Sequence, residues 1–322
     1  MKAAVYYQVG GPEVFRYEDV PDPEPAPDGV LVRVEAISVE GGDTLHRASG
    51  EVAGGPHVVG YQAAGTVLAV GDRVTGFRPG GRVVTVGLDG SHAELRAVPE
   101  QACWAIPAGL STDEAACVPV AFGTAHDALF EFGRLKPGET VLVQAGAGGV
   151  GIAAIQLAKR AGARVLATAS SDDKLARLAG LGLDHGINYR TADFAAQTRR
   201  LTGGHGADVI LDGVGGQILA DSLGCLAYRG RCVSFGDAGR QHATPVDITG
   251  LRQGNQSVTG YFLGAELISG DRAYRMIGGL LDDIAAGQLR VVIDRTFPLA
   301  EAAAAHAYIE SRQAFGRVLL KP

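Results

Sequence analysis

The fold of this chain is decided by one glycine-rich stretch, Val141-Leu142-Val143-Gln144-Ala145-Gly146-Ala147-Gly148-Gly149-Val150-Gly151. Its apolar start predicts a buried strand over Thr140–Ala145, and the residues that follow predict a helix over Gly149–Arg160. Three glycines, Gly146, Gly148 and Gly151, thus lie between a strand and a helix in the spacing GxGxxG. That context is the one that a dinucleotide-binding loop requires.

Each glycine of the motif has a physical task. The first makes the tight turn, the second lets the backbone approach a pyrophosphate, and the third packs the helix on the strand. Exposed N–H groups and the helix dipole would then bind the anion. The loop residues predicted to contact the dinucleotide are Gly146, Ala147, Gly148, Gly149, Val150 and Gly151. The alternative interpretation is a glycine-rich turn that binds no ligand.

The same alternation of strands and helices continues from about residue 119 to residue 260. Further strands are predicted over Arg164–Ser170, Ala207–Asp212 and Arg231–Phe235, and a further helix over Asp172–Leu181. This alternation predicts an α/β fold with a doubly wound parallel sheet and right-handed crossovers.

Residues 1–118 have a different pattern, with short β-rich segments separated by Gly and Pro, such as Val30–Ala36, Gly65–Val70 and Arg82–Val86. They predict a partly open β-barrel or sandwich. After residue 260 come the segments Asp271–Ala286, Leu289–Phe297, Ala300–Glu310 and Gly316–Lys321. This tail is too small for a core of its own, so we expect it to complete the N-terminal domain. The predicted domains are residues 1–118 with 261–322, and residues 119–260.

The composition limits the classes of partner. The chain has 322 residues, 46% hydrophobic and 20% charged, and no apolar run long enough to cross a bilayer. A net charge of −6 disfavours nucleic acid as a partner. The N-terminal residues lack the apolar core of an export signal. Four scattered cysteines predict buried small side chains instead of disulfides, so we expect a cytoplasmic protein.

The end of the second predicted strand bears on the choice of nicotinamide cofactor. An NAD enzyme usually places a carboxylate there for the ribose 2′-hydroxyl. Here the strand ends in Ser170 and Ser171, which leave room for a 2′-phosphate, and Lys174 follows one turn into the next helix. Asp172 and Asp173 are either that carboxylate or helix-start residues favoured by the dipole. The pattern favours NADPH over NADH.

Motifs spread over nearly the whole chain resemble those of the medium-chain dehydrogenase/reductase superfamily. These are the opening Met1–Val5, Gly10–Glu13 and the Ala145–Gly151 loop. Five further segments resemble the zinc-free quinone oxidoreductase (zeta-crystallin-like) branch: Phe77–Gly80, Ile187–Tyr189, Leu201–Gly204, Val233–Gly236 and His306 with Glu310–Arg312. The resemblance implies a doubly wound parallel Rossmann sheet and a β-rich, partly open GroES-like barrel that forms the catalytic domain.

The resemblance also implies roles for residues that contact the cofactor. A Lys, a Tyr and an Arg hold the NADPH 2′-phosphate in that branch, and the matching residues are Lys174, Tyr189 and Arg312. The alternatives are a solvated helix lysine, a half-buried core tyrosine and a surface arginine. Four residues after the last two strands of the sheet are also expected beside the cofactor: Phe235, Gly236, Tyr261 and Phe262. The branch pairs its last strand across a two-fold axis, so we expect a homodimer.

Zinc-dependent relatives take catalytic ligands from a Cys near position 40, a His-Glu pair and a later Cys. By resemblance, those positions hold Glu40, Tyr61-Gln62 and Val120 here. A single carboxylate without His or Cys partners makes a poor zinc site. None of the eight histidines pairs at ligand spacing, so core or surface roles are expected for each. We therefore predict an enzyme that works without a metal.

Without a metal to stabilise an alkoxide, reduction of conjugated acceptors becomes the favoured chemistry. The family has Asn-x-x-Asp where this chain has Glu40 and Asp43, Gly41-Gly42 replaces a bulky pair, and Leu45 replaces a tyrosine. These departures predict a roomier, more acidic pocket with the candidate catalytic residues Glu40, Asp43 and Tyr61, in which Tyr61 could donate a hydrogen bond.

Two kinds of alternative stay open. For the residues, an Asp43–Arg47 salt bridge and a packed aromatic ring at Tyr61 would need no substrate. For the function, the first hypothesis is an NADPH-dependent reductase of quinones or α,β-unsaturated carbonyls, acting on a small-molecule acceptor. The others are an enoyl reductase for acyl or polyketide substrates, and a non-catalytic NADPH-binding structural or regulatory protein.

Overall fold

A computed structural model describes residues 1–52, 54–241 and 245–322 of the chain. Their contacts form two compact units. Unit 1 comprises Met1–Gly123 and Gly264–Pro322, and unit 2 comprises Thr124–Leu263. The sequence placed the two boundaries a few residues earlier, after residues 118 and 260. No helix within the described ranges is long and apolar enough to cross a membrane.

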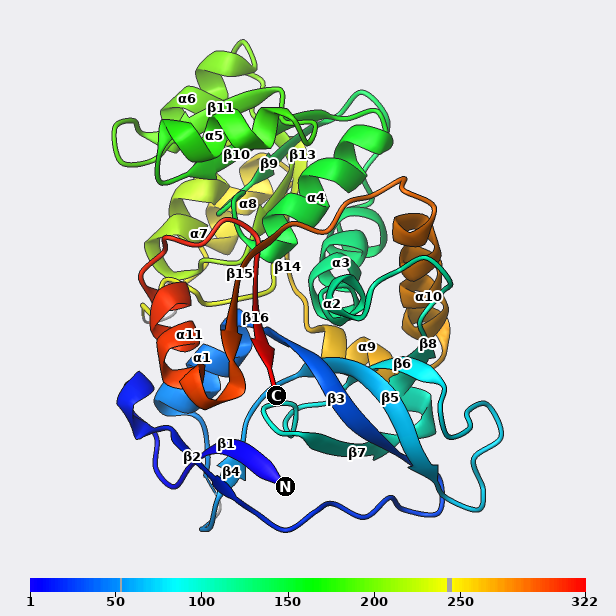
Figure 1. Ribbon diagram of the computed structural model, residues 1–322. Helices are drawn as coiled ribbons and strands as arrows, with labels where there is room; N and C mark the ends of the chain where they lie inside the picture. The colour runs from blue at the N-terminus through cyan, green and yellow to red at the C-terminus, as the bar shows by residue number, and fades with distance from the viewer. Residues whose placement is uncertain (53, 242–244) are drawn as a thin grey trace. The chain divides into compact units, whose positions relative to one another are not determined.

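Unit 2 is built on a parallel sheet, six-stranded in the described part of the chain (Figure 1). Its strands in spatial order are β11 (His185–Asn188), β10 (Arg164–Ala169), β9 (Thr140–Val143), β12 (Ala207–Asp212), β13 (Leu226–Ser234) and β14 (Ser257–Gly260). Numbered along the chain, this order is 3-2-1-4-5-6, that of the dinucleotide-binding doubly wound fold. The predicted Rossmann sheet is confirmed.

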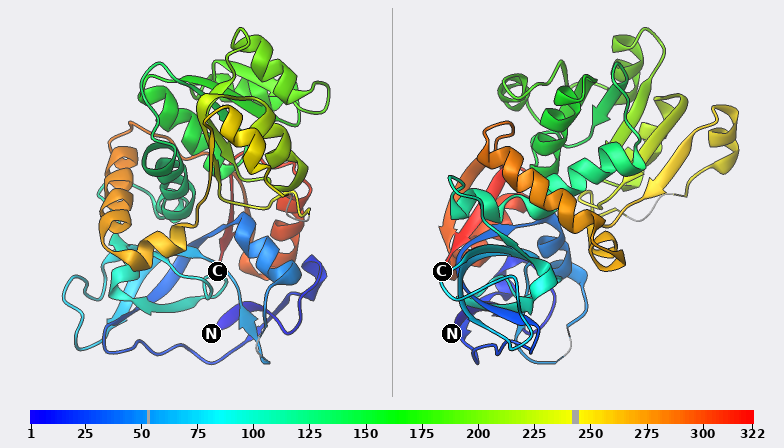
Figure 2. Two further views of the ribbon diagram at one scale, coloured as in Figure 1. Left: turned by 180° about the vertical axis from the view of Figure 1, so that it is seen from behind. Right: turned by 90° about the vertical axis from the view of Figure 1, so that its right-hand side faces the viewer.

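Helices join the strands of unit 2, and the side chains of Ser171, Asp193 and Asp247 cap the starts of three of them. The elements are a π-helix at Asp127–Phe132, α4 (Gly149–Arg160), α5 (Asp172–Ala179), α6 (Phe194–Leu201), α7 (Gly216–Gly224) and α8 (Ile248–Gln253), while α3 (Pro119–His126) spans the unit boundary. Helix α4 has the predicted bounds and buries Ile152, Ile155 and Leu157. Strand β14 lies at one edge of the sheet (Figure 2). Its pairing with a second copy stays a prediction.

Unit 1 contains a larger, mostly antiparallel sheet and a smaller one. The larger has the order β15 (Ile293–Pro298), β16 (Arg317–Lys321), β3 (Gly29–Val39), β5 (Gln62–Val70), β6 (Arg82–Val86) and β8 (Cys103–Ala105), and β7 (Leu95–Pro99) also pairs with β3. The smaller comprises β2 (Arg16–Asp19), β1 (Lys2–Tyr6) and β4 (His57–Val58). Strand β16 pairs with β3, with Val318 opposite Val39. The C-terminal segment thus joins the sheet of the N-terminal segment in unit 1.

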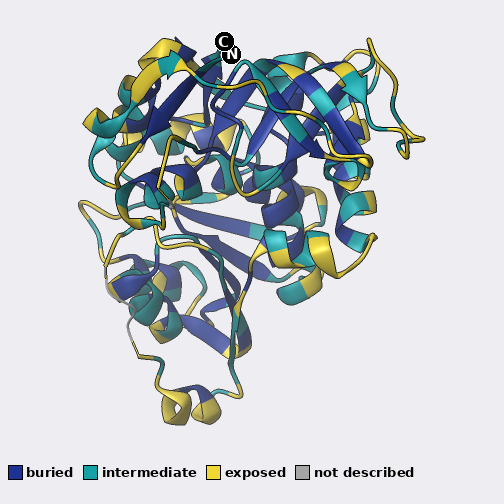
Figure 3. Ribbon diagram, turned by 90° about the horizontal axis from the view of Figure 1, so that it is seen from below, coloured by how far each residue is buried: buried dark blue, intermediate teal, exposed yellow. Residues whose placement is uncertain are grey.

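Helices and 3₁₀ turns connect the strands of unit 1. They are α1 (Gly41–Ser49), α2 (Thr112–Ala116), α10 (Arg272–Ala285), α11 (Ala302–Glu310) and the 3₁₀ turns Pro12–Val14, Glu100–Ala102 and Leu299–Glu301, and α9 (Leu263–Ser269) begins at the unit boundary. The strands are largely buried and the exposed residues gather in loops and on outer helix faces (Figure 3). All four cysteines are free and buried, as predicted.

Candidate active site

The glycine loop of unit 2 leaves the carboxyl end of the central strand β9. Strand β9 lies between β10 and β12, where the order of the sheet reverses. Ligands of open α/β sheets bind at this point. Strand β9 ends at Val143, before the predicted end, because Ala145 adopts a left-handed φ of 52°.

The three motif glycines are required for different reasons. A Cβ on Gly146 would lie 2.8 Å from the Cβ of Ala167, and a Cβ on Gly151 would lie 2.6 Å from the carbonyl oxygen of Ala145. Both distances are too short for real contacts. A Cβ on Gly148 would meet only that oxygen, at 3.4 Å, and Gly148 is exposed. The structure thus leaves an open backbone approach at the second glycine, which fits a dinucleotide pyrophosphate.

A buried chain of hydrogen bonds holds the loop from beneath. Ser222 Oγ and Gln144 Nε2 are 3.0 Å apart, Thr168 Oγ1 donates to Gln144 Oε1 at 2.7 Å, and Ala145 N donates to Thr168 Oγ1 at 3.1 Å. The N–H of Gly146 donates to the Thr168 carbonyl at 2.8 Å. Gln144, Thr168 and Ser222 are each at most 4% exposed. These hydrogen bonds were not predicted from the sequence, because Gln144, Thr168 and Ser222 lie on separate elements and have no characteristic spacing.

Four residues predicted at the 2′-phosphate lie at the carboxyl ends of β10 and β11: Ser170, Ser171, Lys174 and Tyr189. Ser171 caps α5 and accepts from Lys174 N, and Tyr189 N donates to the Ala169 carbonyl at 3.2 Å. Ser170, at the end of β10, is partly exposed. Arg312 is exposed and belongs to unit 1, so its part in the same pocket stays a prediction.

The two neighbouring aspartates belong to the start of α5. Asp172 and Asp173 lie in its first turn, and Asp172 Oδ1 accepts from Asn188 Nδ2 at 3.0 Å. Both residues thus occupy the helix-start positions that one of the two interpretations of the sequence expects. This arrangement favours a phosphate over a bare ribose hydroxyl.

The remaining predicted cofactor residues follow the last two strands of the sheet. Phe235 and Gly236 follow β13, and Phe235 N donates to the Asp212 carbonyl at 2.9 Å. Tyr261 and Phe262 follow β14, where the Tyr261 hydroxyl donates to Asp127 Oδ2 at 3.1 Å while Phe262 is exposed. All four residues thus follow the carboxyl ends of strands, as the glycine loop does. Their contacts with a cofactor stay a prediction.

One further loop at the carboxyl ends of the strands was not predicted from the sequence. Asp212 ends β12, is fully buried, and accepts from the N–H groups of Val214 and Gly215. Burial raises the pKa of this carboxyl group. The run Asp212–Gly216 after a predicted strand, with left-handed Gly215 and Gly216, is the signal that could have identified it.

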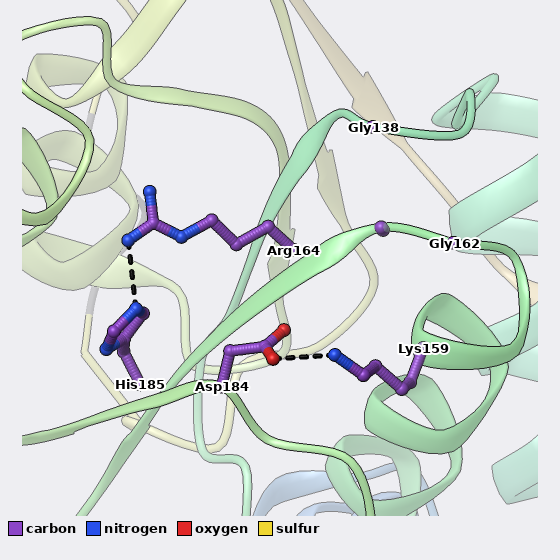
Figure 4. A pocket seen from close by; sticks show the side chains of 7 residues that line it. Gly138, Lys159, Gly162, Arg164, Asp184 and His185 are labelled. Atoms are coloured by element: carbon purple, nitrogen blue, oxygen red, sulfur yellow. Dashed lines mark hydrogen bonds and ion pairs between the residues drawn. The ribbon is translucent and has the colours of Figure 1, made fainter.

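A surface pocket of about 300 Å³ lies at the amino-terminal ends of β10 and β11 in the same sheet. It is lined by Gly138, Lys159, Gly162, Ala163, Arg164, Asp184 and His185 (Figure 4). Lys159 pairs with Asp184 at 2.6 Å, and Arg164 Nη2 lies 2.9 Å from His185 Nε2. Because Arg164 and His185 begin β10 and β11, this pocket is not part of the dinucleotide site.

In unit 1, Glu40 lies in a closed polar network. Its carboxylate accepts from Arg317 Nη2 and Gln62 Nε2, and the other amide atom of Gln62 accepts from Val120 N at 3.0 Å. Arg317 also donates to Ser38 Oγ and the Val39 carbonyl. Glu40 is 4% exposed and Arg317 is 7% exposed. This burial favours a structural role for Glu40 over the pocket-lining role predicted from sequence.

Asp43 is buried in the first turn of α1. Its carboxylate accepts from Glu40 N at 2.8 Å and from Tyr61 N at 3.1 Å. Burial raises the pKa of Asp43 well above its usual value. The Asp43–Arg47 salt bridge that the sequence offered as an alternative is not formed, because Arg47 pairs with Glu310 instead.

Tyr61 differs from both acids because its side chain is only partly buried. Among the described residues, none bonds to its hydroxyl group, whereas both backbone groups of Tyr61 are engaged. Burial, and secondarily Asp43, raises the pKa of the phenol, so it stays protonated at neutral pH. Of the three candidate catalytic residues, Tyr61 is the one with a polar atom available to a ligand.

Comparisons with known proteins match both units. Residues 149–277 match the family described as zinc-binding dehydrogenase, and residues 26–108 match the alcohol dehydrogenase GroES-like domain. A 2-haloacrylate reductase from a Burkholderia species is 37% identical over 99% of this chain and 98% of its own length. A quinone oxidoreductase from Pseudomonas aeruginosa is 38% identical over 97% of each chain. The chain belongs to the medium-chain dehydrogenase/reductase superfamily, in its quinone oxidoreductase branch.

A solved structure of this branch extends the likeness to three dimensions. The quinone oxidoreductase of Escherichia coli complexed with NADPH is 30% identical, with a TM-score of 0.95 and all of both chains covered. The resemblance predicted from sequence motifs is confirmed, as are the Rossmann sheet and the GroES-like β-rich domain.

The name of the matched dehydrogenase family raises the question of zinc. In this branch member the positions of the catalytic ligands hold Glu40, Tyr61-Gln62 and Val120. Over residues 1–52, 54–241 and 245–322, no three His, Cys, Asp or Glu side chains are placed to hold a metal ion. Instead, the Arg317 guanidinium binds the Glu40 carboxylate.

Proposed function

We propose that this oxidoreductase uses NADPH to reduce a quinone or an α,β-unsaturated carbonyl compound, without zinc. The observation that carries the proposal is the Glu40–Arg317–Gln62 network at the position of the metal ligands. A buried guanidinium already neutralises Glu40, so a divalent cation there would face a like charge in a region of low dielectric.

The cofactor half of the proposal rests on unit 2. The open backbone at Gly148 fits the pyrophosphate, and Ser170, Ser171, Lys174 and Tyr189 leave space and donors for a 2′-phosphate. NADPH supplies the hydride when bound. The chain's own contribution is to position the dinucleotide with a rigid loop, since Thr168 and Gln144 fix its conformation.

The acceptor half rests on Tyr61. A conjugated carbonyl that receives a hydride at carbon develops negative charge on its oxygen, and a hydrogen-bond donor stabilises that charge. Tyr61 supplies the donor, and water supplies the proton that completes the product. Conjugation spreads the charge, so such acceptors need less help than a simple ketone.

Charge in unit 1 favours an uncharged acceptor over a carboxylate. The buried arginines nearest in sequence and structure to this region are all engaged with protein groups. Arg47 pairs with Glu310, Arg317 pairs with Glu40, and Arg96 donates to the carbonyls of Tyr61 and Asp89. The halogenated acrylate suggested by the name of the Burkholderia relative is therefore the second candidate.

NADPH oxidation with a panel of acceptors tests the proposal. The panel contains 9,10-phenanthrenequinone, 2-alkenals, a 2-haloacrylate and an enoyl thioester, with NADH as the alternative donor. We expect turnover with the first two, and a Tyr61→Phe variant whose kcat/KM is about 10- to 100-fold lower with unchanged NADPH affinity. Tight NADPH binding with no oxidation by any acceptor would instead support the non-catalytic alternative, and selective use of the thioester would support an enoyl reductase.

A further inference from the structure

The backbone of Tyr61 is held on both sides by hydrogen bonds to buried polar side chains. Asp43 Oδ1 accepts from Tyr61 N at 3.1 Å, and Arg96 Nη2 donates to the Tyr61 carbonyl at 3.0 Å. The N–H of Gly87 also donates to that carbonyl, at 2.8 Å. Asp43 is fully buried and Arg96 is 3% exposed. The main chain at Tyr61 therefore cannot shift without breaking hydrogen bonds to buried polar side chains.

The ring of Tyr61 lies directly against Gly42 at the start of α1. A Cβ placed on Gly42 would be 2.4 Å from Tyr61 Cε2 and 2.6 Å from its hydroxyl oxygen. Contacts this short do not occur, so a side chain at position 42 and the present position of the ring exclude each other. With the backbone fixed, the ring could yield only by rotating about its own side-chain bonds.

We propose that Gly42 is a specificity-determining residue, which keeps free the space that the Tyr61 ring occupies and thereby fixes where the phenol meets the acceptor. This inference rests on the proposed function, because it gives the Tyr61 hydroxyl a carbonyl oxygen to bind. Gly42 thereby selects an uncharged carbonyl compound whose oxygen can reach the hydroxyl group of Tyr61 beside the first turn of α1.

The chemical step balances with groups already named. The acceptor carbon would gain the hydride that NADPH supplies, an electron pair of the conjugated double bonds would move onto the carbonyl oxygen, and the Tyr61 O–H would donate a hydrogen bond to that oxygen. A proton from solvent water would then neutralise the anion, and the hydroxide left behind would be taken up by the buffer. Tyr61 begins and ends the step protonated, so no further base is required.

The neighbouring glycine provides a matched control. A Cβ on Gly41 would meet no atom within 4 Å, although Gly41 lies in the same turn of the same helix. Gly41→Ala and Gly42→Ala therefore make the same chemical change to α1, and only the second meets the Tyr61 ring. Any effect of alanine on helix formation is common to both variants.

The test is a mutant cycle on kcat/KM for 9,10-phenanthrenequinone and a 2-alkenal, with NADPH dissociation constants measured in parallel. We expect Gly42→Ala to lower kcat/KM about tenfold, Gly41→Ala to leave it unchanged, and neither to alter NADPH affinity. In a Tyr61→Ala background, Gly42→Ala should cause no further loss, because no ring remains to be displaced.

Two results would overturn the inference: full activity of Gly42→Ala, or an equal loss in the Tyr61→Ala background. A crystal structure of Gly42→Ala separates this failure from that of the proposed function. If the Tyr61 ring keeps its position there, the steric argument is wrong whatever the enzyme reduces. If the ring has moved while wild-type enzyme reduces neither acceptor, the proposed function is wrong.

Discussion

Glu40 is a residue whose identity at the zinc-ligand position could be read from the sequence, whereas its partner could not. The replacement of a zinc-binding cysteine by an acid was evident from the motif pattern, and it predicted a more acidic pocket. The structure instead gives Glu40 a buried partner, Arg317, 277 residues away in the sequence. No local pattern encodes that pairing, since it depends on β16 lying beside β3.

Removing the charge of Glu40 should therefore destabilise the fold. A Glu40→Gln substitution leaves the Arg317 guanidinium buried without a counter-charge, at a cost of about 3 kcal/mol in the free energy of unfolding. Urea denaturation of the two proteins measures the difference. The exposed Glu24→Gln variant is the control and should change stability by less than about 0.5 kcal/mol. Equal stability of the Glu40→Gln and wild-type proteins would refute the role assigned to the ion pair.

At the scale of elements, the strands and helices with regular patterns were predictable and those with irregular backbones were not. Helix α4 and strand β12 have the bounds expected from sequence. Strand β13 was predicted to start at Arg231 and starts at Leu226, because its pairing with β12 shifts register between Ala207 and Val209. A bulge of this kind interrupts the alternation on which the prediction depended.

The hydrogen-bond chain beneath the glycine loop gives a prediction for these elements. Thr168→Val removes the hydroxyl that binds Ala145 N and Gln144, so the left-handed conformation at Ala145 loses its support. We expect NADPH affinity to fall about tenfold, whereas Thr168→Ser should retain it. Fluorescence titration with NADPH measures the affinity.

Thr198→Val is the control for that prediction, because Thr198 is also buried in unit 2 but lies in α6. Its affinity for NADPH should match that of wild type. Equal affinities of the Val and Ser variants at position 168 would show that the chain does not set the geometry of the loop.

On the scale of whole units, the sequence missed a convergence of histidines. The sequence predicted a core or surface role for each histidine but no contact among them, and four of them meet with Tyr6 and Phe15 in unit 1. The contacts include His92 and His306, whose Nε2 atoms are 3.1 Å apart, and stacked rings of His46 and His57 with centroids 4.7 Å apart. Contacts between residues as far apart in sequence as 92 and 306 follow from tertiary folding, so only the structure reveals them.

This cluster predicts loss of stability in acid. Burial lowers the pKa of His92 to about 3, with Arg96 as a further cause, against 6.5 for a free histidine. Since the unfolded chain binds the proton more readily, the stabilisation is fully present above about pH 6.5 and is lost as the pH falls toward 3. The midpoint of thermal unfolding should drop over that range, and less steeply in His92→Gln than in the exposed His205→Gln control. Parallel pH profiles of the two variants would contradict this account.

The proposed function is hydride transfer to a conjugated acceptor without a metal ion. The most direct test is steady-state NADPH oxidation by 9,10-phenanthrenequinone after exhaustive chelation, with the metal content measured on the same sample. We expect the chelated enzyme, with less than about 0.1 zinc per chain, to keep the kcat/KM of the untreated enzyme, and added zinc to leave it unchanged. Loss of activity on chelation that stoichiometric zinc restores would contradict the account.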